Sequence, residues 1–123
     1  MKYLIMIHSN PGFARLWEEL TDEQRTGLGS GHLALSEELT ASGELIASEG
    51  LAGPEQSTLV TVRDGRTIRT DGPLAEAKEH LAGFYLVDVP SVERAVEIAA
   101  KVPDATWSAV EVRPVLDVAA LMG

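Results

Sequence analysis

The sequence contains one strong β-hairpin signal, and this signal limits how the rest of the chain can be arranged. Two runs of alternating apolar and polar residues, in STLVTVRDGRTIRT, flank the dipeptide Asp64-Gly65. Asp-Gly suits a two-residue turn because both central residues of such a turn need a positive φ. The sequence therefore predicts two antiparallel strands joined at residues 64–65.

Four more strands are predicted on either side of this hairpin. Their segments are rich in β-branched, aromatic and other apolar residues and are bounded by Gly, Pro or Asn. The segments are KYLIMIH (2–8), ELIASEGL (44–51), AGFYLVDV (82–89) and WSAVEVRPVL (107–116).

Two helices are predicted between these strands. The first begins at a capping box, Thr21-Asp22-Glu23-Gln24, and ends near Gly43. The second is capped by Ser91 and stops before Pro103. Short helical turns are also predicted around residues 13–17 and in the last residues of the chain. The first long helix contains three glycines that each cost roughly 1 kcal/mol relative to alanine, so a break, a kink or a later start near Ser30 is expected. These are Gly27, Gly29 and Gly31.

The resulting order is β-α-β-β-β-β-α-β. With the hairpin treated as an insertion, two βαβ units remain, which predicts an α+β, ferredoxin-like split βαβ sandwich. Two helices can cover only one face of its sheet, yet the strands at 2–8 and 82–89 are apolar on both faces. We therefore expect a second copy of the chain on the other face, as a homodimer. The domain is expected to span residues 1–116, with 117–123 as a C-terminal tail.

Composition excludes several classes of partner. The chain has 123 residues, no cysteine and a net charge of −9, from 19 acidic and 10 basic residues. Such a surface repels phosphates, so neither nucleic acid nor an anionic membrane is an expected partner. The N-terminal apolar run is too short for a signal peptide, and no segment is long enough to span a membrane. A cytoplasmic location is expected.

Three histidines are candidates for chemistry. His32 lies on the apolar stripe of the first long helix, so its ring should point at the sheet, either as a hydrogen-bonded core residue or as a pocket residue. His8 ends the first strand, where ligand sites are common but where a histidine at the rim is the simpler interpretation. His80 has the surroundings of a solvated surface residue. No two histidines share a helical turn and no Gly-x-Ser-x-Gly motif is present, so neither a metal nor a serine nucleophile is expected.

The segment TDGPLAEAKEH, residues 70–80, holds a second group of polar candidates. Asp71, Gly72 and Pro73 can form a capped turn that needs no ligand. The same segment also leaves Asp71, Glu76 and Lys78 near one strand edge, where acid–base groups or a polar clamp could stand.

The string TDGPLAEAKEHLAGFYLVDV, with MKYLIMIH before it and VEVRPV after it, resembles the YCII-related family, specifically its DGPF branch. The resemblance runs from Lys2 to about Val115, with Leu74 in place of the phenylalanine of the branch's name. It implies a dimeric α+β barrel of ferredoxin-like chains and an active site with a His–Asp pair. Some relatives act as lyases on chlorinated aromatic substrates. Members of the branch are often encoded beside extracytoplasmic-function sigma factors.

His32 matches the family histidine, but the aspartate is expected just before the proline that ends the second helix, and Val102 stands there. Either Asp71 supplies the carboxylate, or this branch performs different chemistry or none. The first hypothesis is a cofactor-free lyase or proton-transfer enzyme in which His32 is the general base and Asp71 orients it. The expected substrate-binding residues are His8, Glu76, Lys78 and Tyr85. The alternative is a non-catalytic, dimeric module that binds a ligand or serves a regulatory partner. A third hypothesis gives the Asp71 turn a purely structural role.

Overall fold

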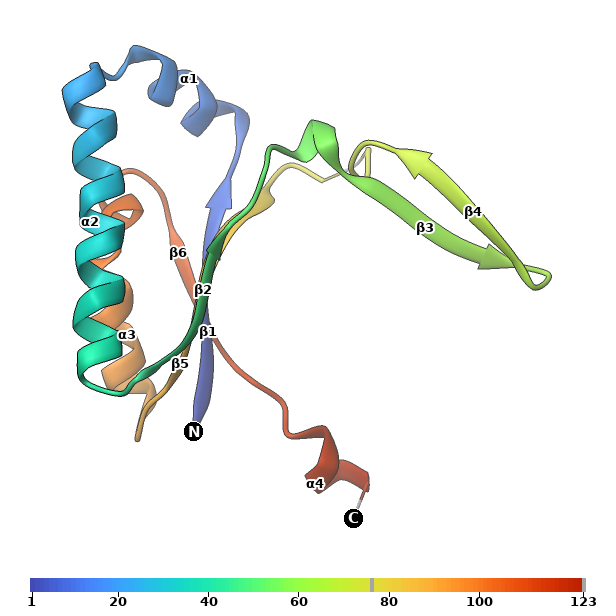
Figure 1. The fold of residues 1–123 in the computed structure, drawn as a ribbon. Helices are drawn as coiled ribbons and strands as arrows, with labels where there is room; N and C mark the ends of the chain where they lie inside the picture. Colours follow the sequence, from blue (N-terminus) through green and yellow to red (C-terminus); the bar gives the residue numbers. More distant parts are fainter. Residues whose placement is uncertain (76, 123) are drawn as a thin grey trace.

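The computed structural model describes residues 1–75 and 77–122 (Figure 1). The elements follow the predicted order with a few short additions. They are β1 (Lys2–Ser9), α1 (Pro11–Glu19), α2 (Asp22–Ala41), β2 (Leu45–Gly50), the 3-10 helix η1 (Pro54–Gln56), β3 (Thr58–Arg63), β4 (Arg66–Asp71), β5 (His80–Asp88), α3 (Val92–Lys101), the 3-10 helix η2 (Pro103–Thr106), β6 (Val110–Pro114) and α4 (Val118–Met122). Among the described residues, no helix is long and apolar enough to cross a membrane.

The main sheet has four strands in the order β2-β5-β1-β6, and its neighbouring strands are antiparallel. This is the order that two βαβ units produce when each helix crosses over one face and the second unit interleaves with the first. The β3–β4 hairpin forms a separate sheet of its own. The predicted ferredoxin-like α+β fold with an inserted hairpin is therefore confirmed.

The hydrophobic core lies between this sheet and the two long helices. Figure 1 shows α2 and α3 on one side of the sheet, while the hairpin and α4 extend toward the other side. Side chains alternate along each strand, so Tyr3 and Ile5 of β1 point toward the helices, whereas Leu4 and Met6 point away. The largest fully buried side chains come from both layers: Ile5, Leu39, Val87, Ile98 and Val102.

Both predicted helix starts are present. Thr21 forms the capping box with Gln24, and the Ser91 side chain accepts a hydrogen bond from the Arg94 backbone N–H. The predicted break at the glycines of α2 was wrong, because the helix runs continuously from Asp22 to Ala41. Packing of the Leu35 and Leu39 side chains into the core outweighs the low helix propensity of glycine.

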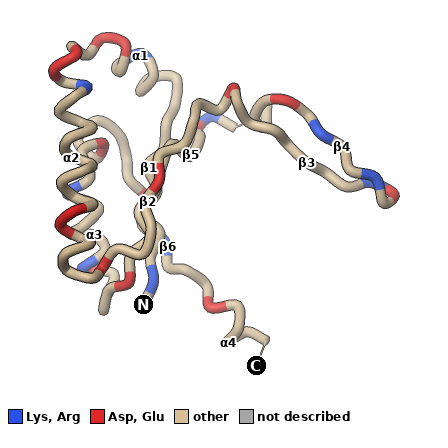
Figure 2. The backbone as a smooth tube through the Cα atoms, viewed as in Figure 1, with Lys and Arg blue, Asp and Glu red and all other residues tan. Residues whose placement is uncertain are grey.

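The hairpin stands away from the rest of the chain. Asp64 and Gly65 have φ values of 51° and 75°, as the predicted two-residue turn requires. Figure 1 shows β3 and β4 projecting as an arm, and Figure 2 shows basic residues along it, whereas acidic residues dominate the helices. The exposed large apolar side chains of this arm are Val60, Val62 and Ile68.

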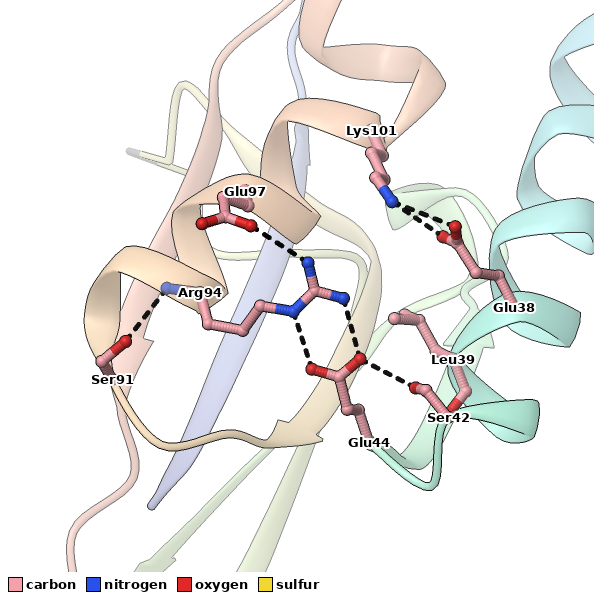
Figure 3. Close-up of polar contacts among 8 residues, drawn as sticks. All are labelled: Glu38, Leu39, Ser42, Glu44, Ser91, Arg94, Glu97 and Lys101. Atoms are coloured by element: carbon pink, nitrogen blue, oxygen red, sulfur yellow. Dashed lines mark hydrogen bonds and ion pairs between the residues drawn. The ribbon is translucent and has the colours of Figure 1, made fainter.

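An ion-pair network joins the end of α2, the start of β2 and the helix α3 (Figure 3). Arg94 donates from Nε and Nη2 to the two oxygens of Glu44, both at 2.8 Å, and the Ser42 hydroxyl donates to the same carboxylate at 2.8 Å. The Arg94 hydrogen bonds, then that of Ser42, lower the pKa of Glu44 to about 2. Glu44 in turn raises the pKa of the Arg94 guanidinium. The network ties the two long helices together at the end of the sheet opposite η2.

Candidate functional site

A pocket of about 440 Å³ lies between α2 and the sheet. This is where the sequence hypothesis placed a site, on the side of the helix that carries His32. Three elements contribute most of the wall, namely α2, β2 and β5. The lining residues are Ile7, His32, Leu33, Ser36, Ser48, Glu49, Gly50, Ala82, Gly83, Phe84, Tyr85 and Asp104.

His32 is held by two hydrogen bonds, one at each ring nitrogen. Its Nε2 lies 2.5 Å from Oδ1 of Asp104, and its Nδ1 lies 2.6 Å from the hydroxyl of Tyr85. The rings of His32 and Tyr85 are stacked, with centroids 5.9 Å apart and planes 16° apart. The imidazole is therefore fixed in both position and orientation by groups from two other segments of the chain.

Asp104 reaches His32 because of how α3 ends. Val102 is 1% exposed and anchors the chain in the core directly after α3. Pro103 then begins η2, and the backbone N–H groups of Trp107 and Ser108 donate to the Asp104 carbonyl at 3.0 and 2.8 Å. Asp104 itself is 9% exposed, and a carboxylate at such a site needs a hydrogen-bond donor. His32 supplies that donor.

The partner of His32 differs from the one expected from the sequence. Asp71 is the last residue of β4, where it pairs with Thr58, and its side chain is exposed. Both nitrogens of His32 are already occupied by Tyr85 and Asp104, so the expected pair with Asp71 is not formed. The resemblance places the partner aspartate just before Pro103. In the structure, the carboxylate that contacts His32 is Asp104, just after Pro103.

The other candidate residues are divided between the pocket and the surface. Tyr85 lines the pocket and contacts His32, whereas His8 lies outside the pocket lining, with its Nε2 2.8 Å from Glu111 Oε1. Lys78 is exposed in the connection between β4 and β5. Glu76 lies outside the described residues. Gly72, with φ +92°, confirms the unusual backbone angle expected for the Asp71-Gly72-Pro73 turn.

Four polar residues of the pocket were missed by the sequence interpretation: Asp104, Ser36, Ser48 and Glu49. Ser36 lies one helical turn after His32, so the spacing of four residues could have placed both on the same face. The Ser36 hydroxyl is 3.4 Å from that of Ser48 on β2, which links the helix to the strand across the pocket. Asp104 could have been found as a carboxylate within a few residues of the end of the second helix.

Burial is the main influence on the acidity of Tyr85 at the wall of the pocket. Burial raises the pKa of the Tyr85 phenol, the charge of Asp104 adds to this, and a hydrogen bond with Ser36 opposes it. Tyr85 is therefore a neutral hydroxyl over the whole physiological pH range. Among the described lining residues there is neither Lys nor Arg. No group of three or more His, Cys, Asp or Glu side chains suited to a metal ion occurs in residues 1–75 and 77–122.

The fold and the site define a ferredoxin-like α+β protein with a histidine–aspartate pair beside a pocket between helix and sheet. Comparison with protein families gives a match to the YCII-related domain over residues 1–119, so the chain belongs to the YCII-related family. It is similar to an uncharacterized protein of Rhizobium meliloti (strain 1021), with 30% identity over 123 residues that cover 93% of this chain and 91% of the relative.

Proposed function

We propose that this protein binds a small molecule in the pocket beside His32 and catalyses proton transfer on it without a cofactor, as a lyase or a related enzyme. The observation that carries this proposal is the direct contact between His32 and Asp104 at the wall of the pocket. A carboxylate that accepts a hydrogen bond from one nitrogen of an imidazole orients the ring and stabilises its protonated form. The pair can therefore take up a proton, which is the change of charge that general-base catalysis requires.

The lining indicates the chemical class of the ligand. Its acidic residues are Glu49 and Asp104, and none of the described lining residues is basic. An anionic ligand would lose its hydration and gain no counter-charge from this lining, which is unfavourable. Ile7, Leu33 and Ala82 supply apolar contact surface, while hydroxyl groups come from two serines, Ser36 and Ser48. We therefore infer an uncharged or cationic small molecule with an apolar body and at least one hydrogen-bonding group.

The experiment that tests the function is a fragment screen by protein NMR, followed by product analysis for every molecule that binds. Ligands should perturb the signals of His32, Ser36 and Ser48 and should be converted by the native chain. Asp104→Asn should retain binding and lower conversion by about 10²-fold or more, because the imidazolium formed during proton transfer loses its counter-charge. Asp71→Asn is the matched control and should behave like the native chain. Binding without any conversion would contradict the enzyme and favour a ligand-binding module.

The second candidate function is a dimeric, non-catalytic module, and the outer face of the sheet favours its dimeric part. Leu4 and Met6 of β1 point away from the helices and lie opposite Leu86 and Phe84 of β5. None of the described helices covers this face in Figure 1. Because four apolar side chains meet there, a second copy of the chain is the partner whose surface matches by symmetry. The homodimer expected from the sequence is therefore part of our proposal for either function.

A regulatory version of this module would need a further surface for its partner. The apolar side chains of the hairpin arm, Val60, Val62 and Ile68, are candidates. An isolated two-stranded sheet is marginally stable in water, so a packing partner for this arm is expected. Hydrogen exchange on the dimer distinguishes an arm that packs against a second copy of the chain from an arm that is free to bind another protein. Slow exchange in the arm would mean that self-association covers its apolar side chains. Fast exchange would favour the accessory role that the resemblance to the DGPF branch implies.

A further inference from the structure

The two hydrogen bonds of His32 leave its imidazole without a free nitrogen. Nε2 is occupied by Asp104 at 2.5 Å and Nδ1 by Tyr85 at 2.6 Å. A ligand in the pocket therefore cannot receive a proton from His32, or give one to it, unless one of these contacts opens. The proposed general base needs an intermediary or a rearrangement.

The hydrogens on His32 and its two partners indicate which group can be the intermediary. The Asp104 carboxylate can only accept, so the Nε2 of His32 carries a hydrogen in both charge states of the ring. In the neutral ring, Nδ1 is then an acceptor and the Tyr85 hydroxyl donates to it. In the imidazolium, Nδ1 carries the second hydrogen and donates to the Tyr85 oxygen. The hydroxyl hydrogen of Tyr85 must then turn to another acceptor.

We propose that the hydroxyl of Tyr85, and not the imidazole of His32, is the group that exchanges a proton with the ligand. The inference rests on the proposed function, and it adds a catalytic residue and a direction of transfer. When the ligand gives up a proton, that proton moves to the Tyr85 oxygen while the Tyr85 hydrogen moves to Nδ1 of His32. The products are a deprotonated ligand, a neutral tyrosine and an imidazolium paired with Asp104. Protonation of a ligand is the reverse.

The surroundings of Tyr85 fit this role. The residue lines the pocket and is only 3% exposed, so bulk water competes little for its hydroxyl. Its oxygen lies 3.4 Å from the backbone carbonyl of His32, a second acceptor within reach in the absence of a ligand. Ser36, half-buried on the next turn of α2, continues the polar path to Ser48. The ligand's hydrogen-bonding group is thus expected at the Tyr85–Ser36–Ser48 end of the pocket.

The test uses diethyl pyrocarbonate on the full chain, because this reagent modifies an imidazole only through an unprotonated, accessible nitrogen. Peptide mass spectrometry follows the modification of His32, with His80 as the reference within the same molecule. In the native chain, His32 should react at least about tenfold more slowly than His80, since a hydrogen bond must open first. Tyr85→Phe removes only the hydroxyl and should accelerate the modification of His32 by a similar factor.

Tyr3→Phe is the matched control, because Tyr3 is another buried tyrosine of the sheet and its hydroxyl contacts the Met1 sulfur, at 4.0 Å, rather than a histidine. This variant should leave His32 as slow as in the native chain, and circular dichroism should show both variants folded. Two results overturn the inference. Fast modification of His32 in the native chain means that a nitrogen is free, and slow modification in Tyr85→Phe means that Tyr85 does not cover Nδ1. Neither result depends on finding a ligand, so an unsuccessful fragment screen would count against the proposed function alone.

Discussion

A side chain on Gly31 would collide with Pro103: a Cβ built at Gly31 would lie 2.7 Å from the proline Cγ. Gly31 directly precedes His32, and Pro103 directly precedes Asp104. The absence of a side chain at Gly31 therefore lets η2 approach α2 closely enough for the aspartate to reach the imidazole. Gly31 thus lowers the helix propensity of α2, but its small size permits the contact between α2 and η2 that forms the site.

This contact predicts opposite effects for two glycines of the same helix. Gly31→Ala should lower the free energy of unfolding by about 1–3 kcal/mol, because a proline ring cannot yield as a flexible side chain would. A Cβ added at Gly29 would meet none of the described atoms within 4 Å, so Gly29→Ala should raise stability by up to about 1 kcal/mol. Urea denaturation of both variants measures this difference. Equal stabilisation of the two would show that η2 moves away without cost.

The contact between His32 and Asp104 should have its own spectroscopic signature. A hydrogen bond of 2.5 Å between an imidazole N–H and a carboxylate is short and charge-assisted, so the Nε2 proton should resonate far downfield and exchange slowly. Asp104→Asn should abolish this signal, while Asp71→Asn should leave it unchanged. Proton NMR in water is the measurement. Loss of the signal in Asp71→Asn would restore the pairing that the sequence suggested.

Local patterns in the sequence were sufficient to predict the fold. The capping box at Thr21, the Ser91 cap and the Asp64-Gly65 turn each depend on residues a few positions apart, and each is present as expected. The continuity of α2 was harder to predict because it depends on tertiary packing of Leu35 and Leu39, which outweighs the intrinsic cost of glycine.

The candidate site was predicted only in part, because its geometry depends on contacts between distant segments. The stripe of α2 identified His32, and Tyr85 was among the expected binding residues. The carboxylate partner lies 72 positions from His32, and a shift of two residues around Pro103 separates the core residue Val102 from Asp104. The spacing of residues does not show whether the residue before or the residue after Pro103 turns its side chain toward α2. With Val102 before the proline, the sequence interpretation turned to Asp71 as the carboxylate.

The Glu44–Arg94 pair predicts how stability depends on acid pH. The folded pKa of Glu44, about 2, lies below its ordinary value of 4.5. The stabilisation is therefore complete above about pH 4.5 and is lost as the pH falls toward 2. Glu44→Gln should lower the free energy of unfolding at neutral pH by about 1–2 kcal/mol, since both side chains keep some contact with water. It should also flatten the decline in stability over that acid range.

Glu38→Gln is the control for this prediction, because Glu38 pairs with Lys101 at 3.0 Å but its side chain is 52% exposed. An exposed pair contributes little, so this variant should keep both the native stability and the native acid decline. Thermal unfolding followed from about pH 2 to neutral pH gives both curves. Matching declines for Glu44→Gln and the native chain would mean that other carboxylates govern acid unfolding.

The face of the sheet that none of the described helices covers predicts a dimer that one charge should break. Leu86 lies opposite Leu4 on this face, and a glutamate there would place an unpaired carboxylate at the centre of the proposed interface. Leu86→Glu should therefore shift the chain from dimer to monomer in analytical ultracentrifugation while its circular dichroism stays native. Val96→Glu is the matched control, since Val96 is an exposed apolar residue of α3, in the helical layer, and this change should leave the dimer intact. A native chain that sediments as a monomer, or an equal loss of dimer in both variants, would place the interface elsewhere or remove it.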